Sequence, residues 1–394
     1  MISIKKALDI LSEATKECRD YEELSLEETY NRVLAQDIYS PINSPSYPRS
    51  AMDGYAVKFS DLEKGTVKKM IGKSYAGDFK DFDYREDSCI RITTGAYIPK
   101  GYDTVIRQED VDLLEDGFIK INGSHKQGDF CIPIGEDVKE GQLLIERSKI
   151  LKSFDQAVLA SCGLAKVKVI RKMRVAFLST GSEIMMPGEA FQAGKIYNST
   201  IFALASIVRQ SGMEVVALDS CPDDEDLLKQ KIRTLSEISD MVITTGGVSV
   251  GDKDLLESVM ADIGEVLFHG IAMKPGTPVM ASKIKDCLVL SCSGNPFAAF
   301  CNFEVLFWAI ADKFYGTSFK KTKKAVIRQG QMKKTVGLTR IVRCLEEDGN
   351  LTIFDRHKNS MIADLNSCNA MLIQEPGRAL SAGDEVDCFY MGEI

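Results

Sequence analysis

The chain has 394 residues, of which 44% are hydrophobic and 27% are charged, and its formal net charge is −8. This length suits about two to four domains, at roughly 100–200 residues per domain. The negative charge excludes a general affinity for nucleic acid or anionic lipid, because both require a basic surface. Any anionic substrate must therefore be bound by a local site.

Cysteine and histidine usage narrows the kind of site that the chain can build. The 11 cysteines include no Cys-x-x-Cys pair, and the 3 histidines, His125, His269 and His357, lie far apart in the sequence. This pattern favours reduced thiols over disulfides and argues against a structural zinc site. Any divalent metal is expected to take oxygen ligands.

The start of the chain and its longest apolar stretch bear on localisation. Ile4, Leu8 and Leu11 stand at helical spacing with charges between them, which is unlike a signal peptide. The apolar stretch 296–311 carries Asn302 and Glu304 and is too short and too polar to span a bilayer. We therefore expect a cytoplasmic protein that binds neither membrane nor nucleic acid.

Three kinds of segment are expected in succession in the first third of the chain. Residues 1–40 are expected to be helical, with apolar positions between residues 24 and 34 and with Glu27 and Glu28 near a helix start. Three prolines between residues 41 and 48 predict an extended loop, because proline lacks an amide donor and restricts the residue before it. From about residue 67 to residue 145, glycines recur between short apolar runs, which indicates a β-rich domain.

Strands and helices alternate from about residue 172. The expected elements are a strand at 174–179, a helix at 199–210, a strand at 213–218, a helix at 223–235, a strand at 240–245 and a helix at 254–263. Such alternation predicts a mostly parallel sheet with helices on both faces and a site beyond the carboxyl ends of the strands. A helix over 297–315 and a basic linker at 320–324 precede a strand-rich end, which predicts a small β-barrel.

The strongest local signal is the glycine-rich loop 244–254, which follows an expected strand and precedes a helix. Its backbone amides and the helix N-terminus would suit a phosphate or another oxyanion. It is not a P-loop, because Asp252 and Lys253 stand where a P-loop has lysine and a hydroxyl residue. The alternative is an ordinary tight turn. The candidate anion-binding residues here are Thr245, Gly246, Gly247, Ser249 and Gly251.

Two further loops are candidates for the same anion. Lys274 would project from the proline-bounded turn 273–278, although a solvated loop lysine is an equally good interpretation. Gly294, Asn295 and Pro296 open the long apolar helix and present another amide-rich helix start.

Carboxylates stand beside these loops. Glu183, Asp223 and Asp254 each follow an expected strand end, so a parallel sheet would place them along one edge. Carboxylates beside an anion would repel it unless Mg²⁺ or a similar hard cation lay between them, so we predict a Mg²⁺ site here. The alternative role for each is helix capping or solvation. Asp53 precedes a glycine in segment 50–57, which is also an ordinary turn.

Together these segments resemble the molybdopterin molybdenumtransferase family (MoeA and the gephyrin E domain) along nearly the whole chain. The matching segments are 50–57, 91–96, 135–137, 179–183, 245–251, 274–276 and 294–296. The resemblance implies a multidomain α/β plus β subunit. Its parts would be a split helical domain at 1–40 and 136–166, an inserted β-rich domain at 41–135, a three-layer α/β domain at 167–318 and a C-terminal β-barrel at 319–394.

The resemblance also implies a function. Members insert molybdate into adenylated molybdopterin with Mg²⁺ and release AMP, and they act as homodimers whose cleft lies between two subunits. Asp53 and Thr94 would then come from one chain, and Glu183, Asp223, Asp254, Lys274 and Pro296 from the other. Arg343 and Ser360 are similar in position to residues that hold molybdate. A molybdopterin adenylyltransferase would supply the substrate, and cofactor-accepting apoenzymes would take the product.

The chain departs from the family pattern at a few positions. Thr277 stands where members have lysine, Ser293 where they have proline, and Phe297-Ala298 where they have Val-Ser. A basic residue expected just before Gly135 is absent. Two rival functions stay open at this point: a molybdopterin-binding chaperone or scaffold without catalysis, and a phosphate-processing enzyme that shares only the central α/β domain.

Overall fold

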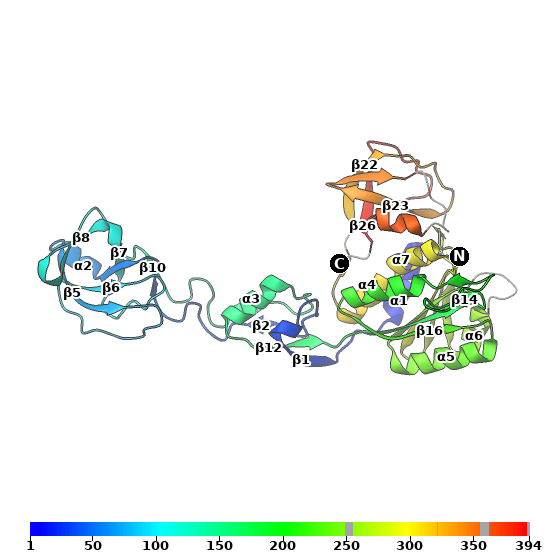
Figure 1. Ribbon diagram of the computed structural model, residues 1–394, viewed down its shortest axis with the longest axis horizontal. Coiled ribbons are helices and arrows are strands. Elements are labelled where there is room, and N and C mark those ends of the chain that lie inside the picture. Colours follow the sequence, from blue (N-terminus) through cyan, green and yellow to red (C-terminus); the bar gives the residue numbers. More distant parts are fainter. Residues whose placement is uncertain (249–254, 321, 355–361, 392–394) are drawn as a thin grey trace.

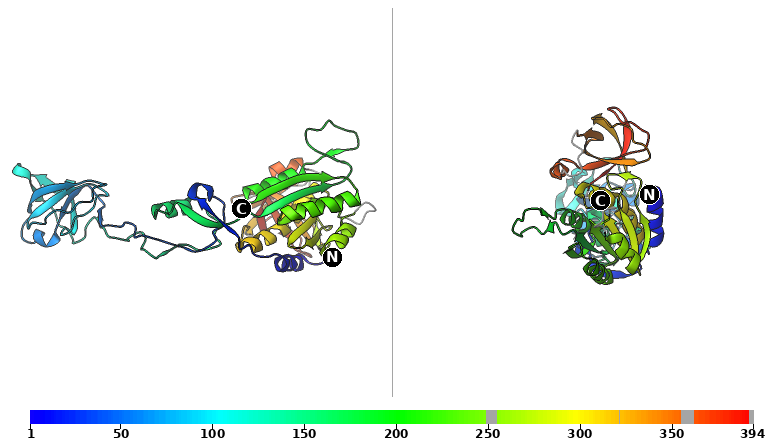
Figure 2. Two further views of the ribbon diagram at one scale, coloured as in Figure 1. Left: turned by 90° about the horizontal axis from the view of Figure 1, so that it is seen from below. Right: turned by 90° about the vertical axis from the view of Figure 1, so that its right-hand side faces the viewer.

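The computed structural model is elongated and describes residues 1–248, 255–320, 322–354 and 362–391. A β-rich body lies at one end of the long axis, a small body with helix α3 lies in the middle, and an α/β body with a C-terminal barrel lies at the other end (Figure 1). Two chain segments run side by side between the β-rich body and the rest, one outward and one returning (Figure 2). The β-rich body is therefore an insertion.

The α/β body is built on a six-stranded sheet in the order β16-β13-β17-β21-β20-β18. The first four of these strands are parallel to one another. At one edge, β20 pairs with β21 in antiparallel orientation, and β18 pairs with β20 in antiparallel orientation. The strand bounds are β13 (Arg174–Thr180), β16 (Glu214–Cys221), β17 (Met241–Thr245), β18 (Glu265–His269), β20 (Met280–Ile284) and β21 (Cys287–Cys292). The helix bounds are α1 (Ile4–Ala14), α4 (Thr200–Gln210), α5 (Glu225–Ile238), α6 (Leu256–Ile263) and α7 (Pro296–Tyr315).

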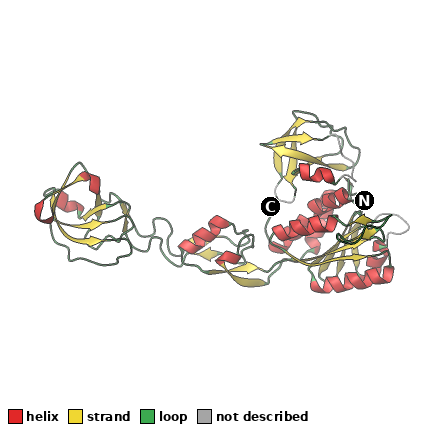
Figure 3. Ribbon diagram, viewed as in Figure 1, coloured by secondary structure: helices red, strands yellow, loops and turns green. Residues whose placement is uncertain are grey.

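The central strand β13 shows why the sheet needs helices on both faces. Successive side chains of a strand point to opposite faces, so a strand that is apolar throughout must be covered twice. Val175 and Phe177 pack with α1, α4 and α7, whereas Ala176 and Leu178 pack with α5 and α6. The helices gather around this sheet in Figure 3. The predicted mostly parallel sheet between two helical layers is confirmed.

The N-terminal segment differs from the helical prediction after its first turns. Helix α1 ends at Ala14, and Ala7 and Leu11 are buried in the core on the α7 side of the sheet. Beyond it the chain forms strand β1 (Tyr21–Ser25) and the 3-10 turn Leu26–Glu28. Strand β1 pairs with β12 (Lys166–Ile170), a partner so distant in sequence that no local pattern indicates it.

The middle and β-rich bodies are small sheets. The middle body joins β1 and β12 to helix α3 (Ser153–Ser161) and to the pair β2 (Ile38–Tyr39) and β11 (Leu143–Ile145). The pair β3 (Arg49–Ser50) and β10 (Cys131–Ile132) leads into the inserted body. That body has a mixed six-stranded sheet in the order β7-β4-β6-β5-β9-β8, and the short helix α2 (Phe59–Leu62). Its strands are β4 (Gly54–Val57), β5 (Val67–Ser74), β6 (Ser88–Ile92), β7 (Thr104–Arg107), β8 (Val111–Leu113) and β9 (Phe118–Ile121).

The C-terminal part is the predicted small barrel. Its strands are β22 (Lys323–Gln329), β23 (Thr339–Glu347), β24 (Asn350–Ile353), β25 (Ala370–Gln374) and β26 (Glu385–Tyr390). The ladder closes because β23 pairs with both β24 and β25. A strand of the α/β body, β19 (Met273–Lys274), adds to the open side of β23 in parallel, so main-chain hydrogen bonds connect the two bodies.

Among the residues that the structure describes, no helix is long and apolar enough to cross a membrane.

Candidate active site

The candidate site lies where the strand order of the α/β sheet reverses. The chain passes from β13 to β16 on one side of it and then to β17 on the other, so the loops after β13 and β17 diverge. Such a divergence opens a crevice at the carboxyl ends of parallel strands. A cavity of about 580 Å³ occupies this place, and loops after β13, β16, β17 and β21 line it.

Glycines let these loops approach one another closely. Gly246 and Gly247, directly after β17, have φ values of +94° and +65°. A Cβ at Gly246 would lie 2.5 Å from the carbonyl oxygen of Thr180, the last residue of β13, and a Cβ at Gly294 after β21 would lie 3.3 Å from the Cα of Gly246. Larger residues would separate the loops, so the cavity wall here is main chain.

Backbone amides give this wall the character of an anion site. Within the described part of the chain, the N–H groups of Gly247, Val248, Gly294 and Asn295 make no hydrogen bond, although all four residues line the cavity. Helix α7 begins beside them, with Asn295 as its N-cap and Pro296 at its first position. A helix N-terminus carries partial positive charge and further unpaired amides, so the arrangement suits a phosphate or another oxyanion.

Two of the predicted carboxylates face the same cavity. Glu183 and Asp223 line it from the loops after β13 and β16. The backbone N–H of Ser182 donates to Oδ2 of Asp223 at 3.2 Å, and the N–H of Asp223 donates to Oγ of Ser182 at 3.1 Å, so the two loops hold each other in register. No described residue that lines the cavity is lysine, arginine or histidine.

The carboxylates fit a hard cation. The described residues contain no group of three or more histidine, cysteine or acidic side chains that could enclose a metal ion. Mg²⁺ needs no such enclosure, because it keeps several waters and takes one or two carboxylates together with substrate phosphates. Glu183 and Asp223 supply that donor set beside the amide-lined wall.

A buried amide that the sequence analysis did not select for the site connects two of its loops. Asn302 of α7 is fully buried; its Nδ2 donates to the carbonyl of Gly276 at 2.7 Å, and its Oδ1 accepts from the N–H of Ser293 at 3.0 Å. Ser293 Oγ also donates to the carbonyl of Pro278 at 2.7 Å. One side chain thus aligns the turn after β19 with the loop after β21. A polar residue inside an apolar helix was the available sequence signal.

Residues 184–198 form a second part of the wall that the sequence did not indicate. The short parallel strands β14 (Ile184–Met185) and β15 (Ile196–Tyr197) form an excursion after β13, and Ile184, Ile196 and Tyr197 line the cavity. Buried Asn198 donates from Nδ2 to Ser179 Oγ at 2.8 Å and closes the excursion onto the sheet. The sequence before helix α4 indicates a loop, but it does not indicate that the end of this loop packs against β13.

The structure thus places eight of the predicted site residues together in one cavity: Glu183, Asp223, Thr245, Gly246, Gly247, Gly294, Asn295 and Pro296. Ser249, Gly251, Asp254 and Ser360 lie outside the described residues.

Four described predicted residues do not line the cavity, and two of them, Lys274 and Arg343, lie near the barrel. Lys274 is exposed and does not line it, although Gly276 of the same turn does. Arg343 is buried in the barrel with its guanidinium 4.8 Å from the ring centroid of Phe297 and 3.7 Å from the Asp364 carboxylate. The sequence pattern of a strand tells which residues are apolar, but not that an arginine on it packs under the start of α7.

Asp53 and Thr94 form a site of their own in the β-rich body, at the other end of the molecule (Figure 1). The backbone N–H of Thr94 donates to Asp53 Oδ1 at 2.7 Å, and the Thr94 hydroxyl donates to the same oxygen at 3.0 Å. These hydrogen bonds, first from the backbone and then from the hydroxyl, lower the pKa of Asp53 below its ordinary value of 3.8. The exposed carboxylate is therefore held ionised and oriented.

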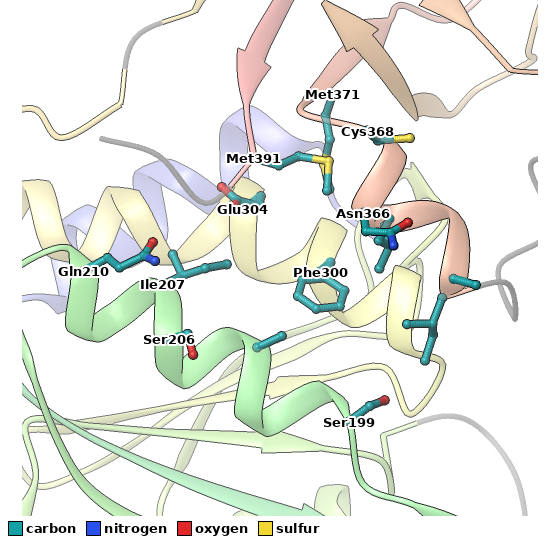
Figure 4. Close-up of a pocket in the computed structure, with 14 residues that line it drawn as sticks. Ser199, Ser206, Ile207, Gln210, Phe300, Glu304, Asn366, Cys368, Met371 and Met391 are labelled. Carbon is teal, nitrogen blue, oxygen red and sulfur yellow. The ribbon is translucent and has the colours of Figure 1, made fainter.

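A second cavity of about 570 Å³ lies between α4, α7 and the barrel and meets the first at Ser199 (Figure 4). Its walls are mainly apolar and rich in sulfur, and Phe300, Cys368, Met371 and Met391 are among the residues that line it. Gly246, Gly247 and Gly294 do not line this second cavity.

The comparisons with known proteins agree with this geometry. Residues 2–163 match the family described as MoeA N-terminal region (domain I and II), and residues 176–312 match the probable molybdopterin binding domain. The molybdopterin molybdenumtransferase of Haemophilus influenzae is 37% identical over 93% of this chain and 92% of its own length. That of Bacillus subtilis is 30% identical over 94% of this chain and 90% of its own length. The molybdopterin biosynthesis MoeA protein of Pyrococcus horikosii has a TM-score of 0.88 at 29% identity, covering 100% of this chain and 99% of that chain.

Fold and site therefore define a protein of the class that builds the molybdenum cofactor. The chain belongs to the molybdopterin molybdenumtransferase family, a family of transferases.

We expect Asn302→Leu to weaken both the fold and the site. The substitution removes both amide contacts and leaves the carbonyl of Gly276 and the N–H of Ser293 without a partner, at a cost of about 1–3 kcal/mol for each buried group. Urea unfolding followed by fluorescence of Trp308, the single tryptophan and also in α7, measures the loss. The control is Asn350→Leu, at an exposed position in the barrel. Equal unfolding curves for the two variants would refute the role of Asn302.

Thr94→Val should raise the pKa of Asp53 toward its ordinary value, because valine keeps the backbone donor and removes the hydroxyl. In the native protein, the stabilising effect of these hydrogen bonds is present above the ordinary pKa and disappears as pH falls through the lowered one. In the variant it should disappear at a higher pH. Carbon-13 NMR titration of the Asp53 carboxyl measures this, with Thr93→Val as the control, since the Thr93 hydroxyl contacts the Ala76 amide instead. An unchanged titration in Thr94→Val would contradict the assignment.

Proposed function

We propose that this chain inserts molybdenum from molybdate into adenylated molybdopterin and releases AMP in a Mg²⁺-dependent reaction. The observation that carries the proposal is the cavity after the parallel strands, lined by two carboxylates and by residues whose backbone N–H groups make no hydrogen bond to any described residue. The proposed substrate contains a diphosphate between two organic groups, which matches an anion site beside a cation site. The family membership supplies the chemistry of the substrate.

The residues of the cavity have distinct proposed roles. Amides of Gly247, Val248, Gly294 and Asn295 would bind the diphosphate oxygens, and the N-terminus of α7 would add its partial positive charge. Glu183 and Asp223 would hold Mg²⁺, which neutralises charge on the diphosphate and orients it. Asp254, which lies outside the described residues, is the proposed third carboxylate.

The departures from the family pattern are compatible with this assignment. The Thr277 hydroxyl donates to the carbonyl of Met273 at 2.5 Å, and the Ser293 hydroxyl donates to the carbonyl of Pro278. Both groups are used within the protein. Anion binding in this chain is therefore assigned to backbone amides, which do not depend on those side chains.

We further propose that the working unit is a homodimer. Asp53 and Thr94 form an ordered carboxylate site, yet they belong to an inserted body at the far end of the chain from the cavity (Figure 1). In the proposed homodimer, a second copy supplies this site to the cavity. The two-fold arrangement usual among homodimers would form two equal composite sites.

The decisive test measures AMP release from adenylated molybdopterin with Mg²⁺ and molybdate. Asp53→Asn keeps the oxygen that accepts from Thr94 but removes the charge, so we expect roughly a hundred-fold loss, at the low end for a positioned acid or base. Asp83→Asn, at an exposed aspartate of the same body, is the control and should leave the rate unchanged. Tight pterin binding without molybdate-dependent AMP release by the native protein would instead establish a cofactor chaperone.

Mixing two inactive variants tests the dimer. Asp53→Asn and Glu183→Gln each disable both composite sites of a homodimer, but a mixed dimer has one intact site. Random mixing should therefore restore about one quarter of the native sites. If both residues act within one chain, the mixture stays inactive, and the assignment across subunits is wrong.

A further inference from the structure

The turn that follows β17 has little intrinsic preference for its conformation. Gly246 and Gly247 both occupy the left-handed region, and glycine retains the greatest backbone freedom of all residues. External contacts must therefore fix the turn. The N–H of Gly246 donates to the carbonyl of Cys292 at 3.1 Å, and the N–H of Leu256, at the start of α6, donates to the carbonyl of Gly247 at 3.2 Å.

The contact to Leu256 also orients the next amide. The peptide group is planar and trans, so its carbonyl and its N–H point in opposite directions. With the carbonyl of Gly247 directed at α6, the N–H of Val248 is directed away from that helix. The next peptide group, which contains the carbonyl of Val248, needs a separate restraint.

His269 supplies that restraint from the end of the edge strand β18. Its Nε2 lies 3.0 Å from the carbonyl oxygen of Val248, and its Nδ1 lies 3.0 Å from a carboxylate oxygen of Glu257 in the first turn of α6. The imidazole is largely buried, with 22% of its side chain exposed, and Val248 is buried. His269 therefore joins the turn to the helix that follows it.

The Val248 carbonyl defines the role of Nε2 in this contact. A carbonyl oxygen can only accept a hydrogen bond, so Nε2 acts as the donor. The contact of Nδ1 with Glu257 holds the ring in the orientation in which Nε2 faces Val248.

We propose that His269 is a positioning residue of the anion site, which through its Nε2 donor fixes the Gly246–Val248 turn so that its amides bind a diphosphate. This inference rests on the proposed function for the identity of the diphosphate. It assigns to His269 an indirect role, through the carbonyl of Val248. Because the turn binds the diphosphate throughout the reaction, loss of His269 should raise KM more than it lowers kcat.

Two substitutions separate the contacts of the imidazole. In His269→Gln the amide nitrogen can take the place of Nε2 and keep the bond to Val248, whereas in His269→Asn it takes the place of Nδ1 and that bond is lost. Calorimetry of the full chain with inorganic pyrophosphate and Mg²⁺ should show about ten-fold weaker binding for His269→Asn, the effect of one hydrogen bond between protein groups, and near-native binding for His269→Gln. The control is His125→Gln in the β-rich body, where Nε2 also contacts a backbone oxygen, at 2.8 Å.

Hydrogen exchange of the Gly247 and Val248 amides in the unliganded protein gives a readout that does not depend on the substrate. We expect faster exchange in His269→Asn than in the native protein and in His269→Gln. Native exchange together with native pyrophosphate binding in His269→Asn would overturn the positioning role. If the native protein binds no pyrophosphate, the proposed diphosphate site fails, while the exchange rates still decide whether His269 fixes the turn.

Discussion

The close approach of three main-chain loops at Gly246 is the constraint on which the candidate site depends. A Cβ on Gly246 would overlap the carbonyl oxygen of Thr180 at the end of β13, and a Cβ on Gly294 after β21 would press against the Cα of Gly246. Because side chains are excluded from this contact, this part of the cavity wall consists of main chain. Asn302 holds the loops after β19 and β21, Asn198 holds the end of β13 and His269 holds the turn after β17. Side chains from three separate places in the chain therefore support the wall.

The sequence predicted the parts of the fold that local patterns encode. The alternation of expected strands and helices indicated the parallel sheet. The glycine loop and the carboxylates indicated the edge of the sheet at which Glu183 and Asp223 lie together. Long-range pairing was not predictable in this way. Strand β1 depends on β12, and β19 depends on β23, and neither short segment has a period of its own.

The distinction between local patterns and long-range contacts also explains which site residues could be predicted. Gly294 and Asn295 were accessible to sequence reasoning because a helix start after a strand has a fixed geometry. The surroundings of Arg343 were not predictable in this way. The alternation of a strand tells on which face of the sheet a side chain lies, but not which residue it contacts there, and the Arg343 guanidinium packs on Phe297. Asn302 was visible only as a polar residue in an apolar helix, and its two partners become apparent only when the loops are placed in space.

The pairing of β19 with β23 makes the barrel part of the geometry of the cavity entrance. Lys274 is bound by strand pairing to the barrel, whereas Gly276, two residues later, is bound through its carbonyl to Asn302 of the α/β body. The main chain between Lys274 and Gly276 is therefore held at one end by the barrel and at the other by the α/β body. A rotation of the barrel relative to the α/β body would act on the segment that leads directly into the cavity wall.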